Sequence, residues 1–187
     1  MRKYRCLHKN YYQIGDYSII PIRDKDKFDI MKWRNEQIHH LRQKQKLSIE
    51  EQTHYFETVV SKLFDQNKPV QLLFSYMYNN KCIGYGGLVH INWEDNNAEV
   101  SFLMDTNNIE SLENEHWIIF LKLIDMLAFE DLSLHKIFAY AYDVRPHLYQ
   151  NLLDNNYFLE ARLKDHYFLN SNYYDVVIHS KFNNIKS

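Results

Sequence analysis

The sequence has 187 residues, of which only four are glycine, and a formal net charge of −2. Average usage predicts about 13 glycines, so loops that need positive φ are scarce. The Gly-rich patterns of P-loop NTPases and of ordinary dinucleotide-binding domains are absent from the sequence. The near-balance of 22 basic and 24 acidic residues gives no sign of an electrostatic nucleic-acid binder.

Composition predicts an ordered globular chain, because aromatic residues make up 16% of it and disordered segments lack them. Cys6 and Cys82 lie far apart and form no CxxC motif, so we expect reduced thiols in a cytoplasmic protein and no structural metal site. No apolar run approaches the roughly 18 residues that span a bilayer, and no apolar region follows the basic N-terminus. We therefore expect no membrane association.

Hydrophobic periodicity and turn signals predict an N-terminal arm or tail over 1–16, followed by a single domain over 17–187. The predicted elements of that domain follow the order β-α-α-β-β-β-α-β-α-β-β: strand 18–22, helix 24–35, a helix starting at the capping box Ser48-Ile49-Glu50-Glu51, strands 70–78, 81–91 and 98–104, helix 112–132, strand 136–142, helix 146–154, and strands 158–163 and 173–182. An antiparallel meander followed by a β-α-β crossover implies an α/β (α+β) fold. Its mixed, mostly antiparallel sheet has six or seven strands and helices on both faces.

Three of the four glycines, Gly84, Gly86 and Gly87, fall in one predicted strand. Glycine inside a strand marks a bulge or a close approach of another backbone. We therefore expect tight packing, or a ligand, against this strand.

Several segments in this order resemble the GNAT N-acetyltransferase superfamily. Residues 129–137 (FEDLSLHKI) are similar to the end of the family's central helix and its next strand, and 152–160 (LLDNNYFLE) to its YEKLGFxxE segment. Residues 162–166 and 174–180 resemble the closing strands of the ribosomal-protein acetyltransferase branch. The resemblance covers nearly the whole chain and implies acetyl-CoA as co-substrate and a primary amine as acceptor.

A further segment narrows the subclass. Lys32-Trp33-Arg34-Asn35, Ile38 and 47–56 resemble the start of nucleotide-amino-sugar N-acetyltransferases, and ribosomal-protein acetyltransferases have a similar start. The resemblance implies that an amino group of a nucleotide-linked sugar is the acceptor. The alternatives are a protein N-terminus and a catalytically silent binding module of the same fold.

The same resemblance places the cofactor on two segments. The strand 98–104 would run along the pantetheine arm, with cofactor-binding positions at Ser101, Phe102, Leu103 and Met104. The pyrophosphate loop would fall at 113–117, with Glu115, His116 and Trp117. This stretch has no glycine and two carboxylates, which would repel phosphates at short range. Either the alignment slips toward 106–111, or the phosphates bind differently, or CoA binding is lost.

Two positions near the next helix also follow from the resemblance. Arg145 occupies the place of a CoA-contacting Asn and can pair with a phosphate; the alternative is an exposed Arg beside Asp143. Leu152 occupies the place of the Tyr that protonates the leaving thiolate. Tyr149 lies one helical turn earlier and is the candidate acid, although it can equally be a packing residue.

Candidate bases and acceptor contacts complete the expected site. Glu99, at the start of the cofactor strand, can take the amine's proton or be an ordinary ion-paired carboxylate. His90 can serve as a base near neutral pH or be structural. Trp33, Arg34 and Asn35 are expected in the acceptor pocket, with Trp33 as a core residue and Arg34 as a helix-terminal charge in the alternative interpretation. The aromatic residues fit either a homodimer surface or the core.

Overall fold

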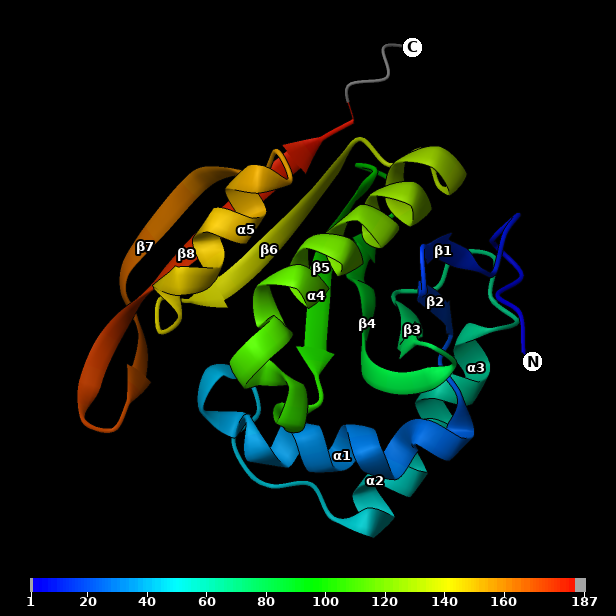
Figure 1. The fold of residues 1–187 in the computed structure, drawn as a ribbon, viewed down its shortest axis with the longest axis horizontal. Helices are drawn as coiled ribbons and strands as arrows, with labels where there is room; N and C mark the ends of the chain where they lie inside the picture. Colours follow the sequence, from blue (N-terminus) through cyan, green and yellow to red (C-terminus); the bar gives the residue numbers. More distant parts are fainter. Residues whose placement is uncertain (1, 184–187) are drawn as a thin grey trace.

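The computed structural model describes residues 2–183, without the side chains of 108–112. Its strands form one eight-stranded sheet in the order β1-β2-β3-β4-β5-β6-β8-β7 (Figure 1). The strands are β1 (Tyr12–Ile14), β2 (Tyr17–Pro21), β3 (Leu72–Tyr78), β4 (Lys81–Asn92), β5 (Asn97–Met104), β6 (Lys136–Tyr142), β7 (Phe158–Leu169) and β8 (Asn172–Phe182). The mixed, mostly antiparallel architecture is the predicted one, with β1 as an additional strand.

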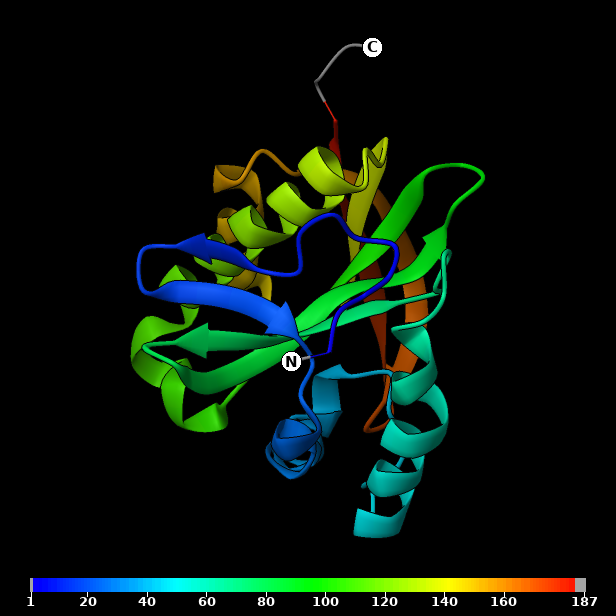
Figure 2. The same cartoon turned by 90° about the vertical axis from the view of Figure 1, so that its right-hand side faces the viewer.

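The helices lie on both faces of the sheet, as predicted. They are η1 (Asp24–Asp26), α1 (Lys27–Glu36), η2 (Ile38–His40), α2 (Ile49–Tyr55), η3 (Phe56–Val60), α3 (Ser61–Leu63), η4 (Thr106–Asn108), α4 (Ile109–Asp125), η5 (Met126–Asp131), η6 (Pro146–Leu148) and α5 (Tyr149–Asp154). Figures 1 and 2 show α4 and α5 over one face and α1 and α2 over the other. Within the described range, no helix is long and apolar enough to cross a bilayer.

The segment before β2 is part of the core instead of a free tail. Strand β1 pairs with β2 in antiparallel fashion, and the side chain of Tyr4 is buried. The Tyr4 hydroxyl donates to the carbonyl of Leu73 at 2.7 Å and accepts from the Leu73 N–H at 3.0 Å. These contacts join residues 69 positions apart, so local patterning could not reveal them.

Strands β5 and β6 are the only parallel pair among the described strands, and they separate almost at once. Their pairing covers Asn97↔Lys136, Ala98↔Ile137 and Glu99↔Phe138. Past Glu99, the edge of β5 that faces β6 has no strand paired to it. The chain therefore keeps an open wedge in the middle of its sheet.

Close packing on the α4 face explains one of the glycines in β4. A Cβ at Gly86 would lie 2.2 Å from the Ser101 carbonyl oxygen and 2.7 Å from Cζ of Phe120 in α4. The rings of Phe102 and Phe120 stack with centroids 4.0 Å apart. The predicted close approach is thus to the chain's own strand β5 and helix α4.

We expect Tyr4→Phe to lower the free energy of unfolding by about 2 kcal/mol, because it takes the hydroxyl acceptor away from the buried Leu73 N–H, while the Leu73 carbonyl keeps its bond from the Ile22 N–H. Chemical denaturation measures this loss. The matched control is Tyr11→Phe, whose hydroxyl bonds Gln13 at an exposed position and which should change stability by less than about 0.5 kcal/mol. Equal effects of the two variants would mean that the N-terminal segment does not contribute to the core.

Candidate active site

The wedge between β5 and β6 opens into a cleft with a cavity volume of about 130 Å³. One wall is β5 from Glu99 to Phe102, and the other is β6 from Ala139 to Tyr142. Helix residues and one loop complete the lining: Trp117, Arg145, Leu148, Tyr149, Leu152 and the segment 40–42. The unpaired edge of β5 offers backbone donors and acceptors to an extended ligand that carries amides.

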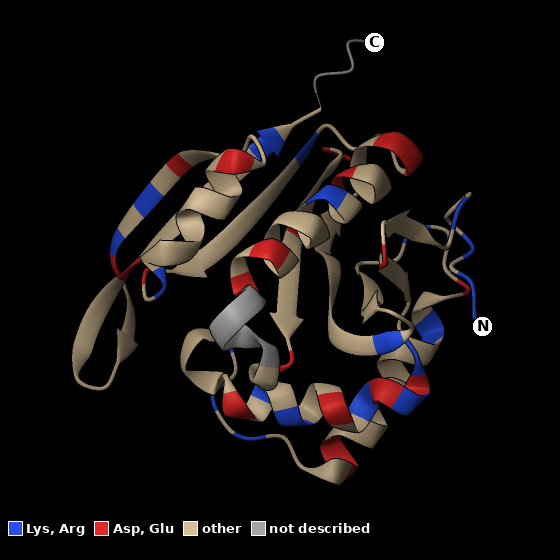
Figure 3. Ribbon diagram, in the orientation of Figure 1, with Lys and Arg blue, Asp and Glu red and all other residues tan. Residues whose placement is uncertain are grey.

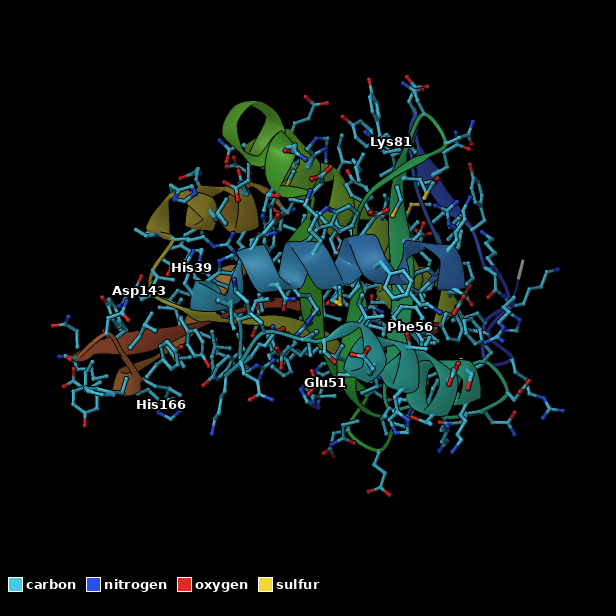
Figure 4. The ribbon with its side chains drawn as sticks, turned by 90° about the horizontal axis from the view of Figure 1, so that it is seen from below. His39, Glu51, Phe56, Lys81, Asp143 and His166 are labelled. Carbon is cyan, nitrogen blue, oxygen red and sulfur yellow. The ribbon has the colours of Figure 1, made fainter. Side chains whose placement is uncertain are left out.

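A second cavity of about 300 Å³ lies on the α1 and α2 side of the sheet. Its walls include residues of α1, α2, η3, β3 and β4, and Figure 4 labels Glu51 in α2 and Phe56 at the start of η3. Most of its lining is apolar, and its charged residues are Arg34 and Glu51. Ser101 lines both this cavity and the cleft, so the two cavities meet at the middle of β5.

Arg34 reaches the second cavity from α1. Its Nη1 donates to the Tyr85 hydroxyl at 2.6 Å and its Nε donates to Oε1 of Gln43 at 2.9 Å. Within the described residues, no carboxylate forms a salt bridge with it. Burial works against the charged form of Arg34, but Tyr85 favours it, and the net shift of the pKa is upward. The cavity therefore contains a half-buried cation held only by neutral groups.

The two neighbours of Arg34 point elsewhere. Trp33 is 4% exposed, belongs to the core and lines neither cavity. The Asn35 amide donates to the Leu47 carbonyl at 2.9 Å and accepts from the Leu47 N–H at 2.8 Å, so it fixes the loop before α2. Of these three positions, only Arg34 lines the second cavity.

Glu99 lines the cleft with a side chain that is only 6% exposed. One carboxylate oxygen accepts from Nη2 of Arg42, and the other lies 3.8 Å from Nε2 of His90. A bulge in β4 places His90 at φ +50°, and its side chain is 68% exposed. His90 lines neither cavity, so it contacts the site only through Glu99.

Arg145 lies in the cleft near the first turns of α4. Its Nη1 is 3.3 Å from Oε1 of Glu113, and Nε2 of His147 is 3.2 Å from Oε2 of the same carboxylate. Burial lowers the pKa of Arg145 although Glu113 favours the cation. His40 lines the cleft beside it, and its Nε2 is buried with no hydrogen-bond partner among the described residues.

Tyr149 also lines the cleft, but its proton is engaged. Its hydroxyl donates to Oδ1 of Asp143 at 2.6 Å. Burial and this carboxylate raise the pKa of Tyr149, while the hydrogen bond lowers the pKa of Asp143, which also pairs with Arg162. Leu152 lies one turn later in the same lining and offers no proton.

The predicted pyrophosphate loop at 113–117 lies inside a helix, because α4 begins at Ile109. Glu115 accepts a hydrogen bond from Tyr17, and the His116 ring packs against Tyr17 and Tyr76, so both point toward β2 and β3 and away from the cleft. Trp117 does line the cleft. The helix start coincides with the alternative stretch 106–111; the side chains of 108–111 lie outside the described part.

Two predicted cofactor positions on β5 lie beyond the cleft lining. Leu103 and Met104 are core residues, and the Met104 carbonyl accepts from Nε2 of Gln37 at 2.8 Å. Ser101 and Phe102 are in the lining. The sequence reasoning missed Arg42, which contacts Glu99, and Tyr85, which contacts Arg34. The partners in each pair lie more than 50 residues apart in the sequence, so no local pattern indicates them.

Comparison with known proteins identifies the family of the chain. Residues 19–178 match a family model described as an acetyltransferase (GNAT) domain. The chain belongs to this family, and it is an acetyl-CoA-dependent N-acetyltransferase. No curated protein matches it.

Solved structures share the fold at low sequence identity. Spermidine N-acetyltransferase from Vibrio cholerae in complex with CoA and spermine superposes with a TM-score of 0.76 at 16% identity, covering 90% of this chain and 96% of that one. A dodecameric structure of the same enzyme gives 0.73 at 17%, covering 90% and 94%. A chimera of the Vibrio cholerae enzyme and hSSAT gives 0.75 at 17%, covering 90% and 96%.

His40 provides a pH-dependent test of the cleft. Burial and then Arg145 lower the pKa of His40 from 6.5 to about 3. Between these two pH values the unfolded chain binds a proton at His40 and the folded chain does not. Stability should fall as the pH drops from 6.5 toward 3, by at most about 1.4 kcal/mol per pH unit. Denaturation at pH 7 and pH 5 should show a smaller loss for His40→Gln than for the wild type. His54→Gln, exposed on α2, should keep the wild-type loss; if His40→Gln also keeps it, His40 is not the group responsible.

Proposed function

We propose that this enzyme acetylates the amino group of a small acceptor that also carries an anionic group, and that the best-fitting class is a nucleotide-linked amino sugar. The observation that supports this is Arg34, a cation in the second cavity without a carboxylate partner among the described residues. A half-buried guanidinium held by neutral groups is disposed to bind a phosphate or a carboxylate.

The same observation disfavours the two other acceptor classes. A polyamine carries several positive charges, and Arg34 would repel them at short range. A protein N-terminus has no anionic group of its own for Arg34 to bind. The lining is mostly apolar, and its one carboxylate, Glu51, is engaged by the Ser48 N–H in the helix cap, so a sugar body with an anionic group at the Arg34 end suits it.

Acetyl-CoA supplies the acyl group as a reactive thioester. The unpaired edge of β5 would hold its extended arm in the cleft, and Ser101 lies where the cleft and the acceptor cavity meet. Glu99 would accept the proton of the acceptor's ammonium group, which makes the amine nucleophilic. Tyr149 would return a proton to the leaving sulfur once the hydrogen bond to Asp143 is broken.

The phosphates of CoA would be held at the other end of the cleft. Helix α4 lines the cleft through Trp117, and the N–H groups of its first turn, which begins at Ile109, would favour anions. Arg145 adds a charge from the opposite wall, and its present partner Glu113 would have to release it. This arrangement would replace the missing Gly-rich loop by a helix start and an arginine.

An acceptor panel tests the proposed substrate class. Thiol release from acetyl-CoA is followed with a UDP-linked amino sugar, the same amino sugar without the nucleotide, spermidine, and a peptide with a free N-terminus. We expect the UDP-linked sugar to give the highest kcat/KM. A higher value for spermidine or for the peptide would contradict the proposal.

Arg34→Met keeps an unbranched apolar stem and removes the guanidinium group with its charge. We expect kcat/KM for the UDP-linked sugar to fall about 100-fold, the equivalent of roughly 3 kcal/mol for a lost charge-assisted contact. Lys32→Met is the matched control, because Lys32 is exposed on the same helix and pairs only with Glu36. Figure 3 shows both basic and acidic residues along α1. An unchanged kcat/KM in Arg34→Met would remove Arg34 from the acceptor site.

Arg145→Gln and Glu113→Gln should change CoA affinity in opposite directions. Loss of Arg145 removes a phosphate contact and should raise the Kd about 10-fold or more, whereas loss of Glu113 frees the arginine and should lower it. Calorimetry with CoA measures both. Lys136→Gln, which disrupts the surface pair with Glu160, serves as control. If the wild type and all three variants bind CoA with the same Kd, Arg145 does not contact the phosphates of CoA.

A further inference from the structure

Arg42 links the two strands that border the cleft. It lies in the loop between η2 and α2, and its guanidinium pairs with Glu99 of β5 while its Cζ lies 5.0 Å from the ring centroid of Tyr140 in β6. The segment 40–42 lines the cleft. The carboxylate that the proposed function assigns to the acceptor's ammonium group is thus already bound by a cation of the chain itself.

We propose that Arg42 is a gate on the candidate base: it occupies Glu99 in the acceptor-free enzyme, and the ammonium group of the acceptor displaces it. This inference rests on the proposed role of Glu99 but not on the identity of the acceptor. Arg42 acts through Glu99 and is a positioning residue.

The charges at Glu99 make the exchange necessary. The side chain of Glu99 is 6% exposed, so water screens the charges around its carboxylate only weakly. An ammonium group and a guanidinium are both cationic, and both bound to one nearly buried carboxylate would repel each other. When the ammonium arrives, Arg42 leaves, and the buried carboxylate keeps one cation throughout.

The loop that carries Arg42 is built to let this side chain move. Its two ends are fixed, because Gln37 donates to the Met104 carbonyl and Asn35 holds both backbone groups of Leu47. Between these anchors, the Arg42 side chain is 46% exposed. It can leave Glu99 for solvent while both anchors remain in place.

The gate also protects the thioester. With the guanidinium on Glu99, this carboxylate is not available to take a proton from water. Without it, Glu99 can accept a proton while the water oxygen forms a bond to the acetyl carbonyl carbon. The carbon–sulfur bond then breaks, the sulfur takes up the proton, and the products are acetate and the free thiol of CoA. Arg42 would suppress this hydrolysis until an amine is present.

The test measures thiol release from acetyl-CoA with no acceptor added. We expect Arg42→Gln to hydrolyse acetyl-CoA about 10-fold faster than the wild type, a small part of the 10²–10⁴ that a positioned base contributes. The rise should vanish in the double variant Arg42→Gln/Glu99→Gln. Arg42→Lys keeps a cation and should stay near the wild type, as should Lys136→Gln.

A wild-type rate in Arg42→Gln, with calorimetry showing that CoA still binds, would overturn the proposal. So would a rise that persists in the double variant. If Arg42→Gln fails to fold, the Nε–H signal of Arg42 is followed by NMR in the wild type, assigned with Arg42→Lys. The signal should shift on addition of the UDP-linked amino sugar and not with UDP alone; no shift at an acceptor concentration that supports turnover would overturn the gate.

The hydrolysis measurement is independent of the acceptor. If the UDP-linked sugar is not acetylated but Arg42→Gln still raises hydrolysis through Glu99, the acceptor class is wrong and the gate stands. If the sugar is acetylated and hydrolysis does not rise, the gate fails alone.

Discussion

The separation of β5 and β6 after Glu99 is the constraint on which the rest of the structure depends. Two parallel strands that pair over a short stretch leave backbone groups without sheet partners, and such groups need another partner or water. The wedge is kept open from both sides: β5 is fixed by its long pairing with β4 and by the stack of Phe102 on Phe120, and β6 is paired with β8 along its length. A ligand with amides in an extended arm completes the strand edge.

The charges around the wedge follow a common scheme. Glu99 is paired with Arg42, Arg145 with Glu113, and the Tyr149 hydroxyl with Asp143, so each chemically useful group is engaged with a group of the chain itself. Pairing offsets part of the desolvation cost of partly buried charges while no ligand is present. Ligand binding at such a site is an exchange of partners. Arg34 differs, since its partners are neutral, and the proposed function therefore rests on it for the charge of the acceptor.

The order of elements could be predicted because it depends on local signals. The capping box at Ser48 and Glu51 forms as expected, and the turn at Asn79-Asn80 joins β3 and β4 with both residues at positive φ. The packing of Tyr4 against Leu73 could not be predicted, since the two are adjacent only after β1 and β3 join the same sheet. The predicted helix begins at 112, three residues after the observed start of α4 at Ile109. The residues before Trp117 are mostly polar and so do not show the apolar spacing of an amphipathic helix.

The three positions Trp33, Arg34 and Asn35 show why a motif does not determine a pocket. Consecutive residues on an α-helix point about 100° apart, so a triplet in α1 cannot direct all its side chains into one cavity. Trp33 faces the core, Arg34 faces the second cavity and Asn35 faces the loop before α2. The sequence resemblance therefore combines three different physical constraints: burial, ligand charge and loop anchoring. In the proposed function only Arg34 concerns the acceptor, and its contacts with Tyr85 and Gln43, which form only in the folded chain, separate it from the other two residues.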